Sequence, residues 1–158
     1  MLIAKAEVFL TEVPYKSPYQ TATNITTKGR HIVLKLTTDT GLAGWGESGI
    51  ISRGYPAQGD TPETMLAVLE AYLCPAIIGT DPCKFEVLMS ALDTLIKGHL
   101  FAKCAIDHAL LDLAGKILNV PVCNLLGGAH NLSYNVSRSL PFASPKEVTE
   151  RALQLQGL

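Results

Sequence analysis

Glycines in the segment 44–49 form the first pattern in this sequence that could do chemistry. The segment reads GWGESG, so Gly44, Gly46 and Gly49 match the spacing of a dinucleotide-binding fingerprint, whose glycines let the backbone approach a pyrophosphate. That fingerprint requires a helix directly after the glycines. The sequence continues instead as IISRGYPAQGDTP, with two glycines and two prolines before any helical periodicity. We therefore predict that Gly44 and Gly46 mark a bulge or a close backbone approach within a strand.

Ser48, Cys104 and His108 are further candidates for nucleophilic or metal chemistry. Ser48 lies in a Gly-x-Ser-Gly run, which differs from the G-x-S-x-G spacing of a serine hydrolase, and no helix follows it. Cys104 and His108 would share a helix face at i,i+4, but no second close pair completes a metal site. The sequence favours a buried thiol beside a hydrogen-bonded or surface histidine. We predict no catalytic residue and no metal ligand in this chain.

Composition and charge indicate a globular protein and do not favour binding to nucleic acid. The 158 residues are 47% hydrophobic and 17% charged, typical of one globular domain, with a second only if it is small. A net charge of -1 favours no nucleic-acid partner. Lys5, Glu7 and Glu12 interrupt the apolar N-terminus, and no run of about 18 apolar residues occurs, so we expect neither a signal peptide nor a membrane span. The four cysteines are then expected to be reduced, in the cytoplasm.

The first part of the chain is predicted to form strands. Residues 2–13, about 31–38 and 42–48 are rich in Val, Ile, Leu, Thr and Phe, which favours three strands. Gly41 stands where a short hairpin loop needs a left-handed residue, so the second and third strands are predicted to form an antiparallel hairpin. Two long loops, Pro14 to Arg30 and Ile50 to Gly59, are predicted after the first and third strands.

Helical periodicity replaces the strand pattern from residue 61. Pro62 suits a first helical position after a cap at Asp60 or Thr61, and Asp81 with Pro82 repeats this start signal. A third helix is predicted over about 99–118, with Asp112 and Lys116 spaced as an i,i+4 pair. The predicted inward stripes of the three helices are Met65, Leu66, Leu69, Tyr72 and Leu73; Phe85, Leu88, Met89, Leu92, Leu95 and Ile96; and Phe101, Ala105, Ile106, Ala109, Leu110, Leu113 and Ile117.

The C-terminal part changes to an alternating pattern. The run LSYNVSRSL at 132–140 predicts a strand, and the capping-box spacing of Ser144 and Glu147 predicts a helix after it. The predicted fold class is therefore α+β, with a three-stranded antiparallel meander followed by a helical bundle. The strand and helix at the end form a βα unit of the kind found in parallel sheets and barrels.

The predicted third helix and its exit carry the most specific motif. This run, AKCAIDHALLDLAGKILNVPVCNLLGG, resembles the N-terminal signature of the mandelate racemase and muconate lactonizing enzyme family, within the enolase superfamily. The segment TDTGLAGWGES also resembles that family's hairpin, which ends in G-x-G-E. The matched positions in the long run include Ala102, Ala105, Ile106, Asp107, Ala109, Leu110, Asp112, Leu113, Gly115, Lys116, Pro121, Val122, Leu125, Leu126 and Gly127.

The resemblance implies a fold and a chemistry. Residues 1–128 are expected to form an enolase-like N-terminal capping domain, and residues 129–158 the first βα unit of a TIM-like β/α barrel. In the family, a base in the barrel removes the proton next to a substrate carboxylate, and a divalent metal, usually Mg2+, stabilises the enediolate. The family's Lys-x-Lys motif and acidic metal ligands have no counterpart among these residues. We therefore expect an N-terminal fragment that is inactive alone, within a full-length racemase, epimerase, cycloisomerase or dehydratase that is a homo-oligomer.

The resemblance also implies substrate-facing residues and structural ones. The two loops correspond to mobile loops that close over the barrel and contact a small carboxylate substrate. Candidate substrate-binding residues there are Tyr15, Tyr19, Thr21, Arg53 and Tyr55. Ser137 in Ser-Arg-Ser-Leu corresponds to the first serine of a Ser-His-Ser-Leu run, which contacts the substrate carboxylate. Asp107, Asp112 and Lys116 are expected to bond and pack as helix residues.

A second hypothesis comes from a different class of protein. With the catalytic half absent from these residues, the helical bundle and meander sheet would serve as a noncatalytic module that binds a partner or makes an oligomer. An unpaired strand at 132–140 would favour such association, because it would expose backbone groups and apolar surface. A well-folded monomer of the 158-residue chain would count against this alternative.

Overall fold

The N-terminal part of the chain forms a β-sheet. The computed structural model describes residues 1–20, 25–49, 60–138, 140 and 142–155. Strands β1 (Ile3–Gln20), β2 (Ile25–Thr38) and β3 (Ala43–Gly49) form one antiparallel sheet in the order β1-β2-β3. The predicted hairpin between β2 and β3 is confirmed. Its loop contains Gly41 at a φ of 85°, a left-handed conformation in which a side chain would be strained.

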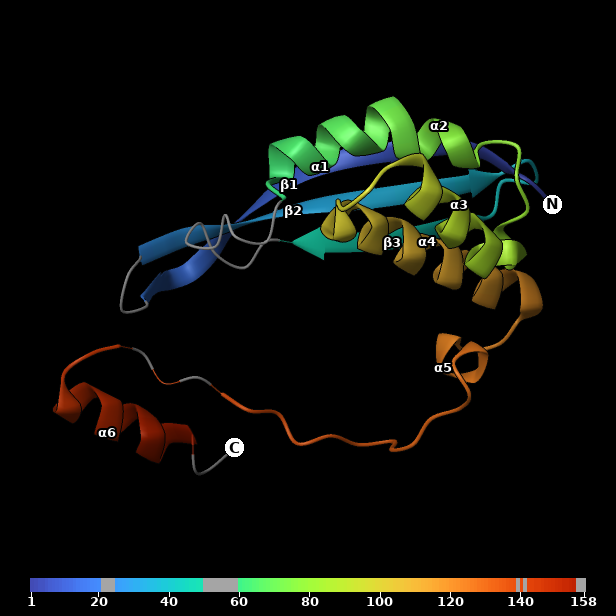
Figure 1. The fold of residues 1–158 in the computed structure, drawn as a ribbon. Helices are drawn as coiled ribbons and strands as arrows, with labels where there is room; N and C mark the ends of the chain where they lie inside the picture. The colour runs from blue at the N-terminus through green and yellow to red at the C-terminus, as the bar shows by residue number, and fades with distance from the viewer. Residues whose placement is uncertain (21–24, 50–59, 139, 141, 156–158) are drawn as a thin grey trace.

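Helices cover one face of this sheet (Figure 1). A continuous helical run consists of α1 (Pro62–Val68), the π-helical turn η2 (Leu69–Leu73) and α2 (Cys74–Ile77). The 3-10 turn η3 (Pro82–Lys84), α3 (Phe85–Leu95) and α4 (Leu100–Leu118) follow, and α5 (Val122–Leu125) and α6 (Pro145–Leu155) lie nearer the C-terminus. α4 packs along β3 and β2, whereas α1 packs over β2 and β1.

The core lies between the sheet and these helices. Alternate residues of β2, namely Ile32, Leu34 and Leu36, are fully buried, as the predicted strand alternation requires. The helices meet them with Met65, Leu69, Leu73, Leu92, Ile106, Leu110 and Leu113, all 1% exposed or less. The predicted helical stripes are therefore largely confirmed.

Two residues of the predicted stripes face solvent. Tyr72 is 56% exposed and Leu95, the last residue of α3, is 51% exposed. Around Tyr72 the helix is wider, because the Cys74 N–H donates to the Leu69 carbonyl five residues back. In such a π-turn Leu73 follows Leu69 toward the core and Tyr72 turns outward.

The segment Pro14 to Arg30, predicted as a long loop, is mostly sheet. β1 and β2 extend through it as a hairpin, and their pairing continues to Gln20 and Ile25, with a register shift between Pro14 and Tyr19. The loop prediction was wrong because β1 is an edge strand, where a proline whose missing N–H would face outward breaks no ladder bond. The second predicted loop, Ile50 to Gly59, lies outside the described residues.

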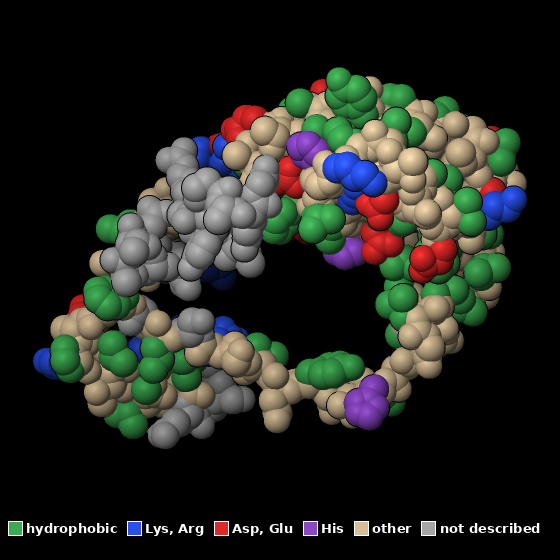
Figure 2. All heavy atoms as spheres, viewed as in Figure 1, with side chains coloured by type: hydrophobic (Ala, Val, Ile, Leu, Met, Phe, Trp, Pro, Cys, Tyr) green, Lys and Arg blue, Asp and Glu red, His purple; other side chains and the backbone are tan. Residues whose placement is uncertain are grey.

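The strand predicted at 132–140 is also corrected. Residues 133–138 have no regular secondary structure and are exposed. A strand needs a neighbour to complete its hydrogen bonds, and no described segment pairs with this one. The predicted helix is confirmed as α6, with the Ser144 hydroxyl and the Glu147 side chain bonded as a capping box. Figure 2 shows open space between the sheet–helix body and the segment that joins α5 to α6.

Among the described residues, no single helix is long and apolar enough to cross a membrane. The pair Pro62–Ile77 and Pro82–Leu95 meets the length and composition criteria only when its two parts are taken together, across a bend of 115°.

Candidate functional site

Gly44 and Gly46 lie where the backbone of α4 crosses β3. A Cβ at Gly46 would lie 1.9 Å from the carbonyl oxygen of Ala105, and one at Gly44 would lie 2.5 Å from that of Ala109. Both distances are shorter than real side-chain contacts allow, so only glycine lets the helix sit directly on the strand. The prediction of a close backbone approach is confirmed. Two of the three positions that matched a nucleotide fingerprint, Gly44 and Gly46, therefore face a helix, and the third, Gly49, faces the His31 side chain of β2.

Three side chains of α4 bind the outer edge of β3, and we call His108, Asp112 and Lys116 the α4 clasp. His108 Nδ1 lies 3.1 Å from the Glu47 carbonyl oxygen, Asp112 Oδ2 accepts the Trp45 N–H at 2.8 Å, and Lys116 Nζ donates to the Ala43 carbonyl at 2.9 Å. Since a carbonyl oxygen only accepts, His108 carries its proton on Nδ1 in this contact.

The spacing of the α4 clasp follows from the two repeat lengths. Four helical residues rise about 6.0 Å, and two strand residues span about 6.8 Å, so side chains at i, i+4 and i+8 meet alternate strand residues. Lys116 Nζ also donates to Asp112 Oδ2 at 2.7 Å, which confirms the predicted i,i+4 pair. The expected structural role is thereby confirmed for Asp112 and Lys116. These bonds fix β3, and with it the sheet end that leads into residues 50–59.

At this end of β3, polar side chains gather from the sheet and from α4. His31 Nδ1 and Glu47 Oε1 are 2.8 Å apart across β2 and β3. Behind them Ser48 is buried, and Cys104 Sγ lies 3.6 Å from His108 Nε2. Burial raises the pKa of the Cys104 thiol, and the nearby Asp107 carboxylate adds to the rise, so the protonated thiol dominates at neutral pH.

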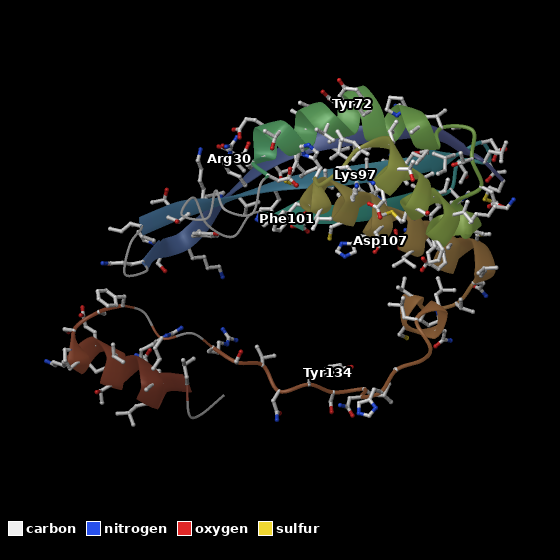
Figure 3. All side chains as sticks on the ribbon, viewed as in Figure 1. Arg30, Tyr72, Lys97, Phe101, Asp107 and Tyr134 are labelled. Carbon is white, nitrogen blue, oxygen red and sulfur yellow. The ribbon has the colours of Figure 1, made fainter. Side chains whose placement is uncertain are left out.

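These groups can donate and accept hydrogen bonds, but they do not make a metal centre. Within residues 1–20, 25–49, 60–138, 140 and 142–155, no three His, Cys, Asp or Glu side chains are grouped so that they could hold an ion. Cys104 and His108 contact each other and lie at the surface of α4. Figure 3 labels Asp107 on α4, with Phe101 nearer the start of the helix.

Asp60 joins the residues before α1 to the start of α4. Its side chain is nearly fully buried, with Oδ1 2.7 Å from His99 Nδ1 and Oδ2 accepting the Phe101 N–H at 3.2 Å. A carboxylate suits this place, because the first N–H groups of a helix have no partner within it and carry partial positive charge. The segment 50–59 is therefore bounded by two fixed points, the end of β3 and this carboxylate.

An ion cluster holds the hairpin of β1 and β2 against α1. Arg30 donates from Nη1 to Glu63 Oε1 at 2.6 Å, and its Nε lies 3.0 Å from Glu12 Oε1. Lys28 also contacts Glu12. Hydrogen bonding to Lys28 lowers the pKa of Glu12, and hydrogen bonding to Arg30 lowers the pKa of Glu63. The cluster is solvent-exposed, so salt will screen it.

The structure places only part of the predicted substrate-binding set. Tyr15 lies on β1, is 40% exposed, and its hydroxyl oxygen approaches Gly29 on β2. Tyr19 pairs with Thr26 in the β1–β2 ladder. Ser137 is exposed in the segment between α5 and α6. Thr21, Arg53 and Tyr55 lie outside the described residues.

Sequence reasoning missed the His31–Glu47 pair, the buried Asp60 and the role of His108. The i, i+4, i+8 spacing of His108, Asp112 and Lys116 was a usable signal for an edge contact, given a glycine-containing strand beside the helix. The His31–Glu47 contact had no such signal, because it depends on the register between β2 and β3.

Comparison with known proteins gives a consistent set of relatives. The family model of the mandelate racemase / muconate lactonizing enzyme N-terminal domain matches residues 5–127. The chain is 34% identical over 97% of its length to muconate cycloisomerase 1 of Rhodococcus opacus. It is 31% identical over 98% of its length to the N-succinyl-L-Arg/Lys racemase of Bacillus cereus. It spans 41% of the length of each of these two relatives.

Solved structures agree with the sequence matches. The crystal structure of the N-succinyl Arg/Lys racemase from Bacillus cereus superposes with a TM-score of 0.92 at 30% identity. The muconate lactonizing enzyme from Pseudomonas fluorescens, complexed with muconolactone, superposes with a TM-score of 0.93 at 27% identity. Each match covers 99% of this chain and 42% of the other. The three-stranded sheet followed by helices is thus the N-terminal fold of enolase-superfamily enzymes.

Proposed function

Because the chain belongs to the mandelate racemase / muconate lactonizing enzyme family, we propose that it forms the substrate-capping region of a cytoplasmic enzyme that removes a proton next to a carboxylate. The reaction class is racemisation, epimerisation, cycloisomerisation or dehydration of a small carboxylate. The observation that carries the proposal is similarity along almost the whole chain to a cycloisomerase and to a racemase.

We further propose that the chain divides at about residue 128. Residues 1–128 would be the capping domain and residues 129–158 the first βα unit of a barrel. In support, the buried core ends within α4 and its contacts with α5, whereas the described residues from 129 to 146 are exposed. A segment that forms a strand only beside the neighbouring strands of a barrel would be exposed and unpaired when those strands are not among the described residues.

The proposed metal is Mg2+, held by residues other than those described here. No three His, Cys, Asp or Glu side chains among the described residues form an ion site. A structural relative from Roseovarius nubinhibens, 26% identical, is a magnesium complex. When bound, such an ion would stabilise the negative charge that develops on the substrate carboxylate as the proton leaves.

In this proposal the chain's own residues bind and enclose the substrate. Tyr15 and Tyr19 on β1, Thr21 directly after β1 in the sequence, and Arg53 and Tyr55 after β3 in the sequence would line the cap. Ser137 would donate a hydrogen bond to the substrate carboxylate without adding charge to the site. The α4 clasp and Asp60 support the idea, because they fix the two points from which residues 50–59 extend. Closure of a cap excludes water and strengthens polar interactions at the reacting carbon.

Proton exchange tests this function. The complete gene product that carries these residues would be incubated in D2O with Mg2+ and a panel of muconates, N-succinyl amino acids and dipeptides. Deuterium incorporation at the carbon next to a carboxylate, read by NMR and abolished by EDTA, is the expected result for at least one compound. Absence of exchange with all of these carboxylate classes would argue against the reaction class.

A further inference from the structure

The two edge strands of the sheet, β3 and β1, differ in how far their outward backbone groups are hydrogen-bonded. On the β3 edge, one outward backbone group of each of three residues is bonded to the α4 clasp: the Ala43 C=O, the Trp45 N–H and the Glu47 C=O. With these groups bonded and the side chains of α4 lying along the edge, another strand cannot complete a ladder with β3. β1, at the other edge, packs against α1 and α2, but no helix residue in the described part of the chain bonds the backbone of Val8 or Leu10.

The ladder shows which β1 groups point outward. Trp45 N–H faces α4, so the odd residues of β3 point away from β2, and its even residues bond β2. Along an antiparallel ladder this direction alternates with each residue. The odd residues of β2 therefore bond β1, where Val33 pairs with Phe9 and His31 with Thr11. It follows that Val8 and Leu10 direct their N–H and C=O groups outward.

The open part of the β1 edge has clear limits. At its start, the backbone of Ile3 is bonded to Gly79 and Thr80, which close the edge there. At its end stands Pro14, which has no N–H to donate. Between them, the outward backbone groups of Val8 and Leu10 have no hydrogen-bond partner in the described part of the chain. This stretch also exposes apolar side chains, since Phe9 is 42% and Val13 55% exposed.

We propose that this open edge of β1 pairs antiparallel with β1 of a second copy of the chain. A two-fold axis at Phe9 would let Val8 of each copy exchange both backbone bonds with Leu10 of the other. The same register places Lys5 opposite Val13 and Glu7 opposite Thr11, so no like charges meet. The two Phe9 rings would adjoin, each already stacked on its own Trp45 with a centroid distance of 6.5 Å.

A proline substitution tests this pairing directly. Leu10→Pro removes an outward N–H and keeps the bonds between β1 and β2, whereas the matched Leu10→Ala shortens the same side chain and keeps the N–H. By light scattering over a concentration series, the wild-type chain and Leu10→Ala are expected to dimerise. Leu10→Pro should bind itself about tenfold or more weakly, because each dimer loses two hydrogen bonds. A monomeric wild type, or a Leu10→Pro dimer of unchanged affinity, would overturn the proposal.

Amide exchange gives a second readout that does not depend on folding of the proline variant. In the wild type, the Val8 and Leu10 amides should become protected from exchange as the protein concentration rises, while the amide of Lys97, outside the sheet, should not change. Exchange at Val8 and Leu10 that is independent of concentration would contradict pairing at this edge. The same result together with dimers in light scattering would mean that the chain associates elsewhere, for example through residues 132–140, and would also overturn the proposal.

Discussion

The carboxylate of Asp112 on α4 accepts the backbone N–H of Trp45 on β3 at 2.8 Å, and this bond joins residues 67 positions apart in sequence. The same oxygen is bonded to Lys116, whose ammonium also reaches the Ala43 carbonyl. One carboxylate thus organises two outward groups of an edge strand. These bonds to β3 explain why Asp112 and Lys116, four residues apart, lie on the same face of α4.

Removal of the Asp112 carboxylate should therefore destabilise the fold. Asp112→Ala leaves the Trp45 N–H without its acceptor and removes one of the two acceptors of the Lys116 ammonium, and we expect a loss of about 1–2 kcal/mol in the free energy of unfolding. Asp107→Ala is the control, since Asp107 lies on the same helix and has no hydrogen bond to a described residue. Urea unfolding of both variants measures the difference. Equal losses would show that the clasp bond contributes nothing specific.

A methyl group at Gly46 should be far more damaging. In Gly46→Ala the new Cβ meets the Ala105 carbonyl oxygen and the Ala109 nitrogen at 1.9 and 2.7 Å, so α4 must move off β3. We expect a loss of about 3 kcal/mol or more, because neither backbone can yield locally. Gly41→Asn is the matched control, since a Cβ there meets nothing within 4 Å and Asn tolerates positive φ. Thermal unfolding compares them, and a Gly46→Ala variant as stable as the control would refute the contact.

Asp60 should act through its hydrogen bonds and its charge. Asp60→Ala removes the acceptor of the Phe101 N–H and the partner of His99, and we expect a loss of about 2 kcal/mol. Asp60→Asn keeps an oxygen that can accept from Phe101 and should lose less than half as much. Chemical denaturation of the pair separates the two contributions. If the two variants are equally unstable, the charge and not the cap bond is what matters.

The buried thiol of Cys74 should resist alkylation. Burial raises the pKa of Cys74 from 9.0 to about 12, so at pH 8 the reactive thiolate is scarcely populated in the folded chain. Iodoacetamide should label the exposed Cys123 quickly and Cys74 only in denaturant, as peptide mass spectrometry would show. Comparable labelling of both cysteines in the native protein would contradict this burial.

The same shift gives a pH dependence with a definite sign. Because the folded pKa is raised, the contribution of Cys74 to stability is fully present below pH 9.0 and falls as pH rises toward 12. The unfolded chain releases this proton first, so alkaline conditions favour unfolding. A Cys74→Ala variant should show a shallower loss of stability over this range in denaturation curves measured at several pH values.

Elements with a local signal could be predicted from the sequence. The β2–β3 hairpin followed from Gly41, the helix starts from Thr61–Pro62 and Asp81–Pro82, and the glycine contact from the absence of a helix after Gly49. Each of these depends on residues close together in the chain. The same is true of the i,i+4 pair of Asp112 and Lys116.

Features that depend on distant partners were predicted poorly. Pro14 suggested a loop, but the edge position of β1 in the sheet tolerates it. The alternation at 132–140 suggested a strand, but a strand forms only where another segment completes its hydrogen bonds. Asp60 and His99 are 39 positions apart, and no local pattern indicates that they meet.

Proton exchange by two forms of the protein tests the central claim most directly. The complete gene product with Mg2+ and the 158-residue chain with Mg2+ would be compared in D2O against the same carboxylates by NMR. Deuterium incorporation next to a carboxylate is expected for the complete product and not for the 158-residue chain. Exchange by these residues alone, or none by the complete product, would contradict the assignment of a cap whose chemistry lies in the barrel.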